Sequence, residues 1–198
     1  MDRILLIGSN NKSKTRELRA LLDDSPWDLR RLDDFDPVPE AEETQDTFEG
    51  NALLKARYYA RRFNVACVAD DSGLEVDALN GAPGVYSARY AGVNCTYEDN
   101  NRKLLAALEG IPEEGRKARF VCLAAFVNED GGEHVERGSV GGVIAAECRG
   151  EHGFGYDPVF IPEGFDQTFG ELPPEVKAGV SHRGRAFGKL CTHLASIA

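Results

Sequence analysis

The sequence predicts a single α/β domain with a mixed central sheet, arranged in two lobes with a cleft between them. Short apolar runs alternate with helical patterns in the first half of the chain, which is typical of parallel strands joined by helices. Consecutive strand patterns with glycine-rich turns follow and indicate an antiparallel part of the sheet. The chain has 198 residues, of which 42% are hydrophobic, so it can bury its own core and residues 1–198 are taken as one domain.

Five elements are expected in the first half of the chain. They are a buried strand over 4–8, a helix over 14–22, a helix that begins near 46 and reaches 63, a strand over 65–69 and a helix over 97–108. Asp46 and Glu49 match a capping box at the start of the second helix. Asn51 and Lys55 are four residues apart on that helix and therefore share one face.

Strands and one long helix are expected in the second half. The strands cover 118–127, 133–140 and 143–148, and a turn over 128–132 joins the first two. Residues 150–174 are rich in glycine and proline, which is typical of loops. The final helix has four apolar residues at helical spacing, namely Ala186, Leu190, Leu194 and Ile197.

The charge of the chain limits its partners. Asp and Glu number 33 against 23 Lys and Arg, and the resulting net charge of −10 disfavours binding to nucleic acid or to an anionic membrane. Much of the excess acid lies between residues 23 and 49. This stretch is either a solvated acidic loop or part of a metal site. An anionic ligand would need a local basic pocket.

Two observations predict a cytoplasmic location. The apolar run over 4–7 is too short for a signal peptide or a membrane span. The five cysteines lie far apart and form no CxxC pair, so neither a zinc site nor a disulfide framework is indicated. Free thiols suit a reducing compartment.

A polar loop between the first strand and the first helix is a candidate phosphate site. The loop consists of Ser9, Asn10, Asn11, Lys12, Ser13 and Lys14. A strand, a loop and a helix in this order direct unpaired backbone N–H groups and the positive end of a helix at one point, where phosphate groups bind. The alternative is an ordinary capped turn. Gly8 is the only glycine in this segment, and neither a Walker A motif nor a GxGxxG motif is present.

Two adjacent acids, Asp70 and Asp71, come directly after the strand over 65–69 and are followed by Ser72 and Gly73. Carboxylates at the carboxyl end of such a strand lie where α/β folds bind ligands. Mg²⁺ prefers oxygen ligands of this kind and can bridge them to substrate phosphate. The alternative is an Asp-rich turn that Gly73 closes.

Two groups of residues near the C-terminus can bind a nucleotide. The first group is Lys177, Ser181, His182 and Arg183. The second group is Phe154, Gly155, Tyr156 and Asp157. The cations of the first group suit a phosphate or an oxo-purine, and the rings of the second suit stacking on a base. The alternatives are a basic, solvent-facing helix end and ordinary hydrophobic packing of a loop.

Taken together, these motifs resemble a known family. The motifs are S-x-N-x-x-K-x-x-E from Ser9, FEGNALLKA from Phe48, ADDSGL from Ala69, GAPGVYSAR from Gly81, GFGYDP from Gly153 and SHR from Ser181. In this order they resemble the inosine triphosphate pyrophosphatase family, and its bacterial dITP/XTP pyrophosphatase branch looks most similar. The resemblance extends from Ile4 to the final helix.

The resemblance implies an inosine triphosphatase-like fold, a homodimer, Mg²⁺ as cofactor and a purine nucleoside triphosphate as substrate. It implies that dITP, ITP and XTP are cleaved between the α and β phosphates, giving a nucleoside monophosphate and diphosphate. The loop from Ser9 to Lys14, Lys55 and Ser72 would then bind the substrate.

The resemblance also implies roles for the remaining candidates. Glu43 and Asp71 would hold Mg²⁺, with Asp70 as a further candidate ligand, and Asp71 would be the catalytic base. Phe154 and Tyr156, with Gly155 and Asp157 in the same loop, would bind the purine. Lys177, Ser181, His182 and Arg183 would contact base and phosphate. His182 and Arg183 would recognise the 6-oxo group, which adenine lacks.

Two other functions are compatible with single motifs. An aspartyl-phosphate phosphatase would use Asp70 or Asp71 as a nucleophile and release inorganic phosphate. A nucleotide-binding regulator would bind a nucleotide without turnover. The crowded acids argue against the regulator, because binding alone gains little from carboxylates placed near phosphate.

Overall fold

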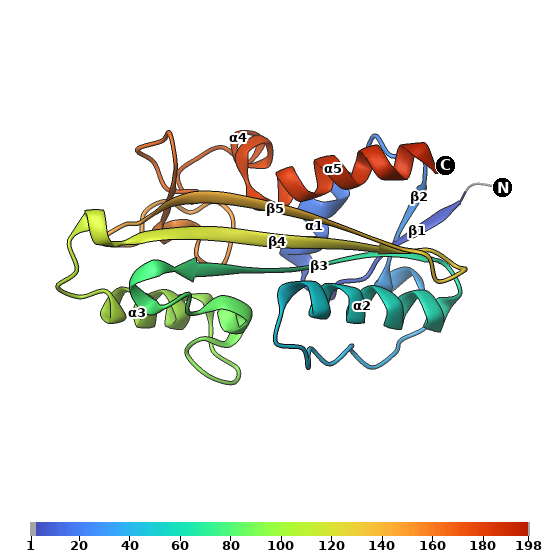
Figure 1. Ribbon diagram of the computed structural model, residues 1–198, viewed down its shortest axis with the longest axis horizontal. Helices are drawn as coiled ribbons and strands as arrows, with labels where there is room; N and C mark the ends of the chain where they lie inside the picture. The colour runs from blue at the N-terminus through green and yellow to red at the C-terminus, as the bar shows by residue number, and fades with distance from the viewer. Residues whose placement is uncertain (1–2, 198) are drawn as a thin grey trace. The chain divides into compact units, whose positions relative to one another are not determined.

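The structure is a computed structural model that describes residues 3–197, and it contains one six-stranded sheet (Figure 1). The strand order is β2-β1-β3-β4-β5-β6. The strands are β1 Ile4–Ile7, β2 Asp28–Arg31, β3 Ala66–Val76, β4 Lys117–Val127, β5 Glu133–Ile144 and β6 Phe160–Pro162. β1 is parallel to β2 and to β3, whereas β5 and β6 are antiparallel. The predicted α/β fold with a mixed sheet is therefore confirmed.

Five α-helices accompany the sheet. They are α1 Lys12–Leu21, α2 Phe48–Phe63, α3 Tyr97–Ala107, α4 Pro174–Val180 and α5 His182–Ser196. Helix α1 begins two residues earlier than expected, because the Asn11 side chain caps it. The capping box predicted at Asp46 and Glu49 is wrong, since the Thr47 hydroxyl accepts the hydrogen bond from the Gly50 N–H. Over residues 3–197, none of the helices has both the length and the apolar surface that crossing a bilayer requires.

Two strands have no counterpart in the sequence prediction. β2 lies within the stretch read as an acidic loop, and only Leu29 of its four residues packs against the core. β6 has three residues and pairs with β5 around Val143 and Ile161. Such short strands owe their place to backbone pairing with a longer neighbour, and their sequences therefore carry little periodicity.

Two strand boundaries also differ from the prediction. β5 runs without interruption where two strands were expected, and Gly142 lies inside it. A side chain at Gly142 would overlap the Ile161 carbonyl oxygen of β6, so a glycine there allows close strand pairing rather than a break. β3 continues to Val76 and does not end at Ala69.

Contacts divide the described residues into two compact units. The first unit comprises residues 3–71, Cys122–Gly138 and 183–197, and the second comprises Ser72–Val121 and Ser139–His182. β3, β4 and β5 each contribute one part to either unit.

The first unit has α2 on one face of its strands and α1 with α5 on the other (Figure 1). Leu5 and Ile7 of β1 and Val68 of β3 are buried against Leu18 of α1 and Phe187 of α5. Because side chains alternate along a strand, the intervening residues of β3 face α2. This alternation decides where the acids of β3 point.

The second unit has its own apolar core. Leu74 of β3, Leu104 of α3 and Phe120 of β4 are buried in it, together with Phe160 of β6 and Tyr156. The Phe120 ring meets the Phe160 ring edge-on, with centroids 4.7 Å apart. This core supports the loop that contains the predicted base-binding residues.

Candidate active site

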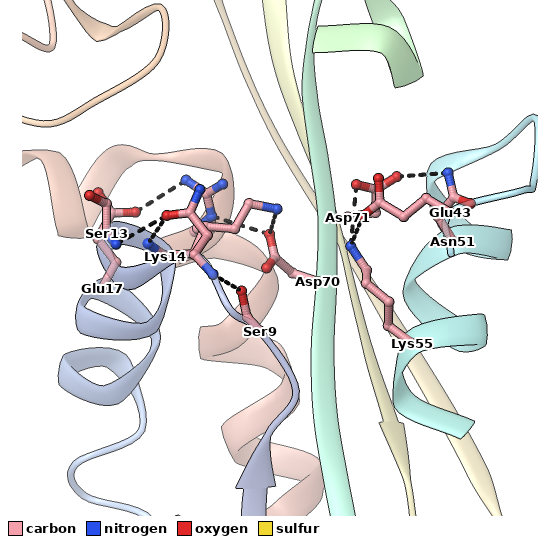
Figure 2. Close-up of polar contacts among 11 residues, drawn as sticks. Ser9, Ser13, Lys14, Glu17, Glu43, Asn51, Lys55, Asp70 and Asp71 are labelled. Carbon is pink, nitrogen blue, oxygen red and sulfur yellow. Dashed lines mark hydrogen bonds and ion pairs between the residues drawn. The ribbon is translucent and has the colours of Figure 1, made fainter. Parts of the chain in front are cut away.

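The paired acids lie within β3 and not at its end. Asp70 is 2% and Asp71 5% exposed, and both belong to a strand that continues to Val76. Figure 2 shows Asp70 on one side of β3 and Asp71 on the other. This arrangement follows from the two-residue period of a strand. The prediction that the pair lies at a strand end is therefore wrong, and the two carboxylates are held apart by the strand itself.

Asp70 belongs to a cluster that also contains Lys14, Glu17 and Arg183, and we call it the Asp70 cluster. Asp70 Oδ2 lies 3.4 Å from Lys14 Nζ and accepts a hydrogen bond from Arg183 Nε at 3.2 Å. Arg183 Nη1 also donates to Glu17 Oε2 at 3.1 Å. Helices α1 and α5 thus each present one cation to the same buried carboxylate. Figure 2 shows Lys14 of α1 beside Asp70.

Burial lowers the pKa of Lys14, although the Asp70 carboxylate opposes this effect. Lys55 and Arg183 lower it further by repulsion. An ammonium group in such a place is stabilised by any additional anion. The Asp70 cluster is therefore suited to receive a phosphate group beside Lys14.

Asp71 belongs to a second cluster with Glu43, Asn51 and Lys55, which we call the Asp71 cluster. Lys55 Nζ donates to Glu43 Oε1 at 2.5 Å and lies 3.6 Å from Asp71 Oδ1. Asn51 Nδ2 donates to Asp71 Oδ2 at 3.2 Å. Asn51 and Lys55 reach Asp71 together because both lie on the face of α2 that packs on β3 (Figure 2).

The surroundings shift the pKa values of Asp71 and Lys55 in the Asp71 cluster. Burial raises the pKa of Asp71, although the cations of Lys55 and Lys14 oppose the shift. Burial alone would lower the pKa of Lys55, but the carboxylates of Asp71 and Glu43 outweigh burial and raise it. Asp71 is therefore a stronger base than an exposed aspartate, and Lys55 stays charged beside it.

The two carboxylates of the Asp71 cluster fit a hard divalent cation. Oxygen atoms of Glu43 and Asp71 converge on one positive charge, which in this structure is the Lys55 ammonium group. Mg²⁺ is commonly bound by one or two carboxylates, with water and substrate phosphate as its other ligands. Across residues 3–197, no group of three or more His, Cys, Asp or Glu side chains is arranged to hold a metal ion. Asp70 pairs with Lys14 and Arg183 and does not join the two carboxylates.

The loop from Ser9 to Lys14 is ordered by its own side chains. Asn11 Oδ1 accepts hydrogen bonds from the N–H groups of Ser13 and Lys14, and Ser9 Oγ accepts one from the Asn11 N–H. Two of the N–H groups expected to be unpaired are thus capped by Asn11. A bound phosphate has to replace Asn11 at these groups or bind beside them, next to the exposed Asn10 and Lys12.

Asp157 is the centre of the predicted base-binding loop in the second unit. Its Oδ2 atom accepts hydrogen bonds at 2.7 Å from the Phe154 N–H and from Lys177 Nζ. A side chain at Gly153 would overlap this carboxylate, so the GFGYDP motif needs glycine there. Lys177 is buried and forms an ion pair with Asp157, and it also lies 5.2 Å from the centre of the Phe154 ring. In this structure Lys177 orders the loop.

The two aromatic residues of this loop have different environments. Tyr156 is only 4% exposed, and its hydroxyl donates to the Ser87 carbonyl oxygen at 2.9 Å. Tyr156 therefore packs as a core residue in this structure, and its stacking on a base stays a prediction. Phe154 is half-buried, and its ring lies 6.0 Å from that of Tyr97. Asn101 Nδ2 donates to the Gly155 carbonyl oxygen and so supports the loop from α3.

Ser181 joins α4 to α5, and His182 and Arg183 are the first two residues of α5. Ser181 ends α4 and is buried, and its N–H donates to the Lys177 carbonyl oxygen. The His182 ring is 2% exposed and stacks on the Phe120 ring, with centroids 4.6 Å apart and planes 8° apart. Arg183 belongs to the Asp70 cluster, whereas Ser72, one residue beyond Asp71, is half-buried in β3. The residues predicted to bind a nucleotide are thus divided between the two units.

Asn51 and Glu17 contact residues of the site, although the sequence analysis assigned them no role in it. Both lie in segments that the sequence motifs already included, and Asn51 shares a helix face with Lys55. That spacing is the signal that identifies Asn51 as a neighbour of Asp71. The motif from Ser9 ends at Glu17, but it does not identify Arg183 as the partner of Glu17, because the two residues are 166 positions apart.

The sequence is similar to known proteins over nearly its whole length. The model of the Ham1 family matches residues 5–193. A dITP/XTP pyrophosphatase from Geobacter sulfurreducens is 49% identical over 190 residues, which cover 96% of each chain. A dITP/XTP pyrophosphatase from Nocardia farcinica is 49% identical over 197 residues, covering 98% of this chain and 96% of the other.

Solved structures are equally similar. A HAM1 protein from Coxiella burnetii has a TM-score of 0.89 at 41% identity, and the match covers 98% of this chain and 99% of the other. A nucleoside-triphosphatase, or dITP/XTP pyrophosphatase, from Mycobacterium abscessus has a TM-score of 0.77 at 47% identity, covering 94% and 98%. The fold and nearly the full length of the chain are shared with these proteins.

Proposed function

Because the chain belongs to the Ham1 family, we propose that it hydrolyses deaminated purine nucleoside triphosphates such as dITP, ITP and XTP. The products are a nucleoside monophosphate and diphosphate. The observation that carries the proposal is the Asp71 cluster, in which a buried carboxylate with a raised pKa lies beside a lysine and a second carboxylate. A general base and cations close to it are what phosphoanhydride hydrolysis needs.

The chain's own residues supply the charge for the triphosphate. Lys14 on one side of β3, and Lys55 on the other, bind the phosphate oxygens and offset their negative charge. Asp70 is a positioning residue, because it holds Lys14 and Arg183 in place from a buried site. Asn10 and Lys12 of the loop are exposed and add donors at the start of α1.

Asp71 is the catalytic base in this proposal. It orients the attacking water and takes its proton, while Asn51 fixes the carboxylate through Oδ2. Glu43 and Asp71 would hold Mg²⁺, which would supply positive charge for the phosphoryl oxygens. Lys55 turns from these carboxylates to the phosphates when the nucleotide binds. The oxygen of the deprotonated water forms a bond to the α phosphorus, the bond from that phosphorus to the bridging oxygen breaks, and diphosphate leaves.

Base recognition belongs to the residues around Phe154 and to the SHR motif. The partly exposed Phe154 ring stacks on the purine, and the loop that carries it is held by Asp157 and Lys177. His182 and Arg183 donate to the 6-oxo group. Adenine has an amino group at this position and leaves such donors unsatisfied, which discriminates strongly between the two bases.

A nucleotide panel tests the proposal. We expect kcat/KM for dITP, ITP and XTP to exceed that for ATP and dATP by at least about 10²-fold, because the mismatch leaves buried donors unpaired. Diphosphate release at steady state with Mg²⁺ measures these values. Equal rates on dITP and dATP would refute the selectivity.

The nature of the released product separates this activity from an aspartyl-phosphate phosphatase. Phosphate is measured with and without added inorganic pyrophosphatase. The proposed reaction gives a phosphate signal only after that enzyme is added, since diphosphate itself is not detected. A signal without it would favour the phosphatase.

The Arg183→Ala variant tests how the protein recognises the purine base. We expect a loss of about 2–3 kcal/mol in kcat/KM for dITP with little change for dATP, because only a 6-oxo purine satisfies the guanidinium donor. The ratio of the two kcat/KM values is the measured quantity. Equal losses on both substrates would instead make Arg183 a phosphate ligand, together with Lys14 in the Asp70 cluster.

We also propose a homodimer in the cytoplasm that binds neither nucleic acid nor membranes. The net charge of −10 disfavours polyanionic partners. None of the five cysteines, which all lie within residues 3–197, forms a disulfide, and this suits a reducing compartment. Light scattering of the purified chain measures the oligomeric state.

A further inference from the structure

A basic pocket lies in the first unit next to the Ser9 to Lys14 loop. Its volume is about 430 Å³. Lys12, Arg16 and Arg19 of α1 line it, together with Arg31 at the end of β2. The first three are spaced by four and three residues and therefore lie on one face of α1. Four cations from two elements thus surround one cavity in a chain whose net charge is −10.

The protein places few negative charges near the side chains of these four cations. Within residues 3–197, no side-chain ion pair joins any of them to a carboxylate, although the Arg31 backbone N–H donates to Asp34 Oδ2 at 2.8 Å. Asp33 is the one acid among the described lining residues. Other arginines of the same unit are paired, since Arg57 binds Glu133 through two hydrogen bonds of 2.6 Å. Like charges on one helix face repel each other unless an anion lies between them.

The position of the pocket in the fold also favours an anion. β1 and β2 are parallel, and Arg31 is in register with Ile7, so the pocket lies beyond the carboxyl ends of two neighbouring strands. The N-terminus of α1 is at this edge, where the helix dipole attracts negative charge. The cations, the strand ends and the helix dipole therefore all favour an anion in the pocket.

We propose that this pocket is a second phosphate site that binds an oligophosphate anion, and that its ligand is inorganic diphosphate. The choice of diphosphate rests on the proposed function, because diphosphate is the product of that reaction. The pocket shares Ser9, Asn10 and Lys12 with the loop that binds the triphosphate. Released diphosphate therefore passes from the loop to Arg16 and Arg19 along a continuous basic surface.

Calorimetric titration with inorganic diphosphate, in the absence of Mg²⁺, tests the site. Wild-type protein is expected to bind two equivalents per chain, one beside Lys14 of the loop and one beside Arg16, Arg19 and Arg31 of the pocket. The Arg16→Ala/Arg19→Ala variant is expected to lose the second equivalent or to bind it at least about tenfold more weakly. Orthophosphate, which has one phosphate group, is expected to bind the pocket more weakly than diphosphate.

The matched control is Arg61→Ala/Arg62→Ala, which removes two exposed arginines from α2 of the same unit. It changes the net charge equally and is expected to keep both equivalents. The proposal is overturned if wild-type protein binds one equivalent, if Arg16→Ala/Arg19→Ala binds like wild type, or if the control loses as much. Circular dichroism confirms that both variants are folded.

Hydrolysis of dITP is measured on the same three proteins. If the protein hydrolyses dITP but binds one equivalent of diphosphate, the proposed second phosphate site is wrong and the proposed function stands. A chain without dITP hydrolysis, but with an equivalent that depends on Arg16 and Arg19, overturns the proposed function and leaves the pocket as an oligophosphate site.

Discussion

We expect the Asp71→Asn variant to lose about 10²–10⁴-fold in kcat on dITP while the fold stays intact. Asparagine has the size of aspartate and can keep a hydrogen bond to Asn51, but it neither accepts a proton nor carries charge for a cation. Both proposed roles of Asp71 disappear together. Steady-state diphosphate release with Mg²⁺ measures the loss, and chelation of Mg²⁺ should abolish wild-type activity reversibly.

The control for this variant is Asp77→Asn, which makes the same chemical change just after the end of β3. The Asp77 side chain is 59% exposed, and its nearest cation is Arg119 Nη1 at 3.8 Å. Wild-type kcat is expected for it. Near-normal turnover by Asp71→Asn would move the base to another residue, and Glu43 would be the first candidate because it shares Lys55 with Asp71.

The Lys177→Ala variant should be destabilised by about 3–5 kcal/mol in its free energy of unfolding. Its ammonium group is the cation paired with Asp157, whose side chain is only 3% exposed. Removal of Lys177 takes away the ammonium group that lies 2.7 Å from the buried Asp157 carboxylate, and loss of one partner of a buried ion pair costs more than the pair itself contributes. Urea denaturation followed by circular dichroism gives the value.

Two further variants separate this effect from a general loss of charge. Lys117→Ala removes an exposed lysine from β4 in the same unit and should change stability by less than about 0.5 kcal/mol. The double variant Lys177→Met/Asp157→Asn has no buried charge left at this position and should be more stable than Lys177→Ala. A loss below about 1 kcal/mol in Lys177→Ala would show that Asp157 does not depend on this partner.

Sequence patterns predicted the elements whose own residues carry a period. The apolar residues of β1 and the apolar face of α5 are examples, and the turn over 128–132 joins β4 and β5 as expected. The sequence also identified Lys55 and Asn51 as neighbours, because a helix places residues four apart on one face. Elements without a period, such as β2 and β6, exist through backbone pairing with distant strands and could not be predicted locally.

In the candidate site, too, some features follow from the local sequence and others from contacts between distant segments. The sequence by itself determined which chemical groups this protein has for nucleotide hydrolysis, and the order of its motifs determined the family. The tertiary structure decided which of these groups meet. Because β3 continues through Asp70 and Asp71, its alternation directs one carboxylate to Lys14 and Arg183 and the other to Lys55 and Glu43. Burial, which depends on the whole chain, made Tyr156 a core residue and raised the pKa of Asp71.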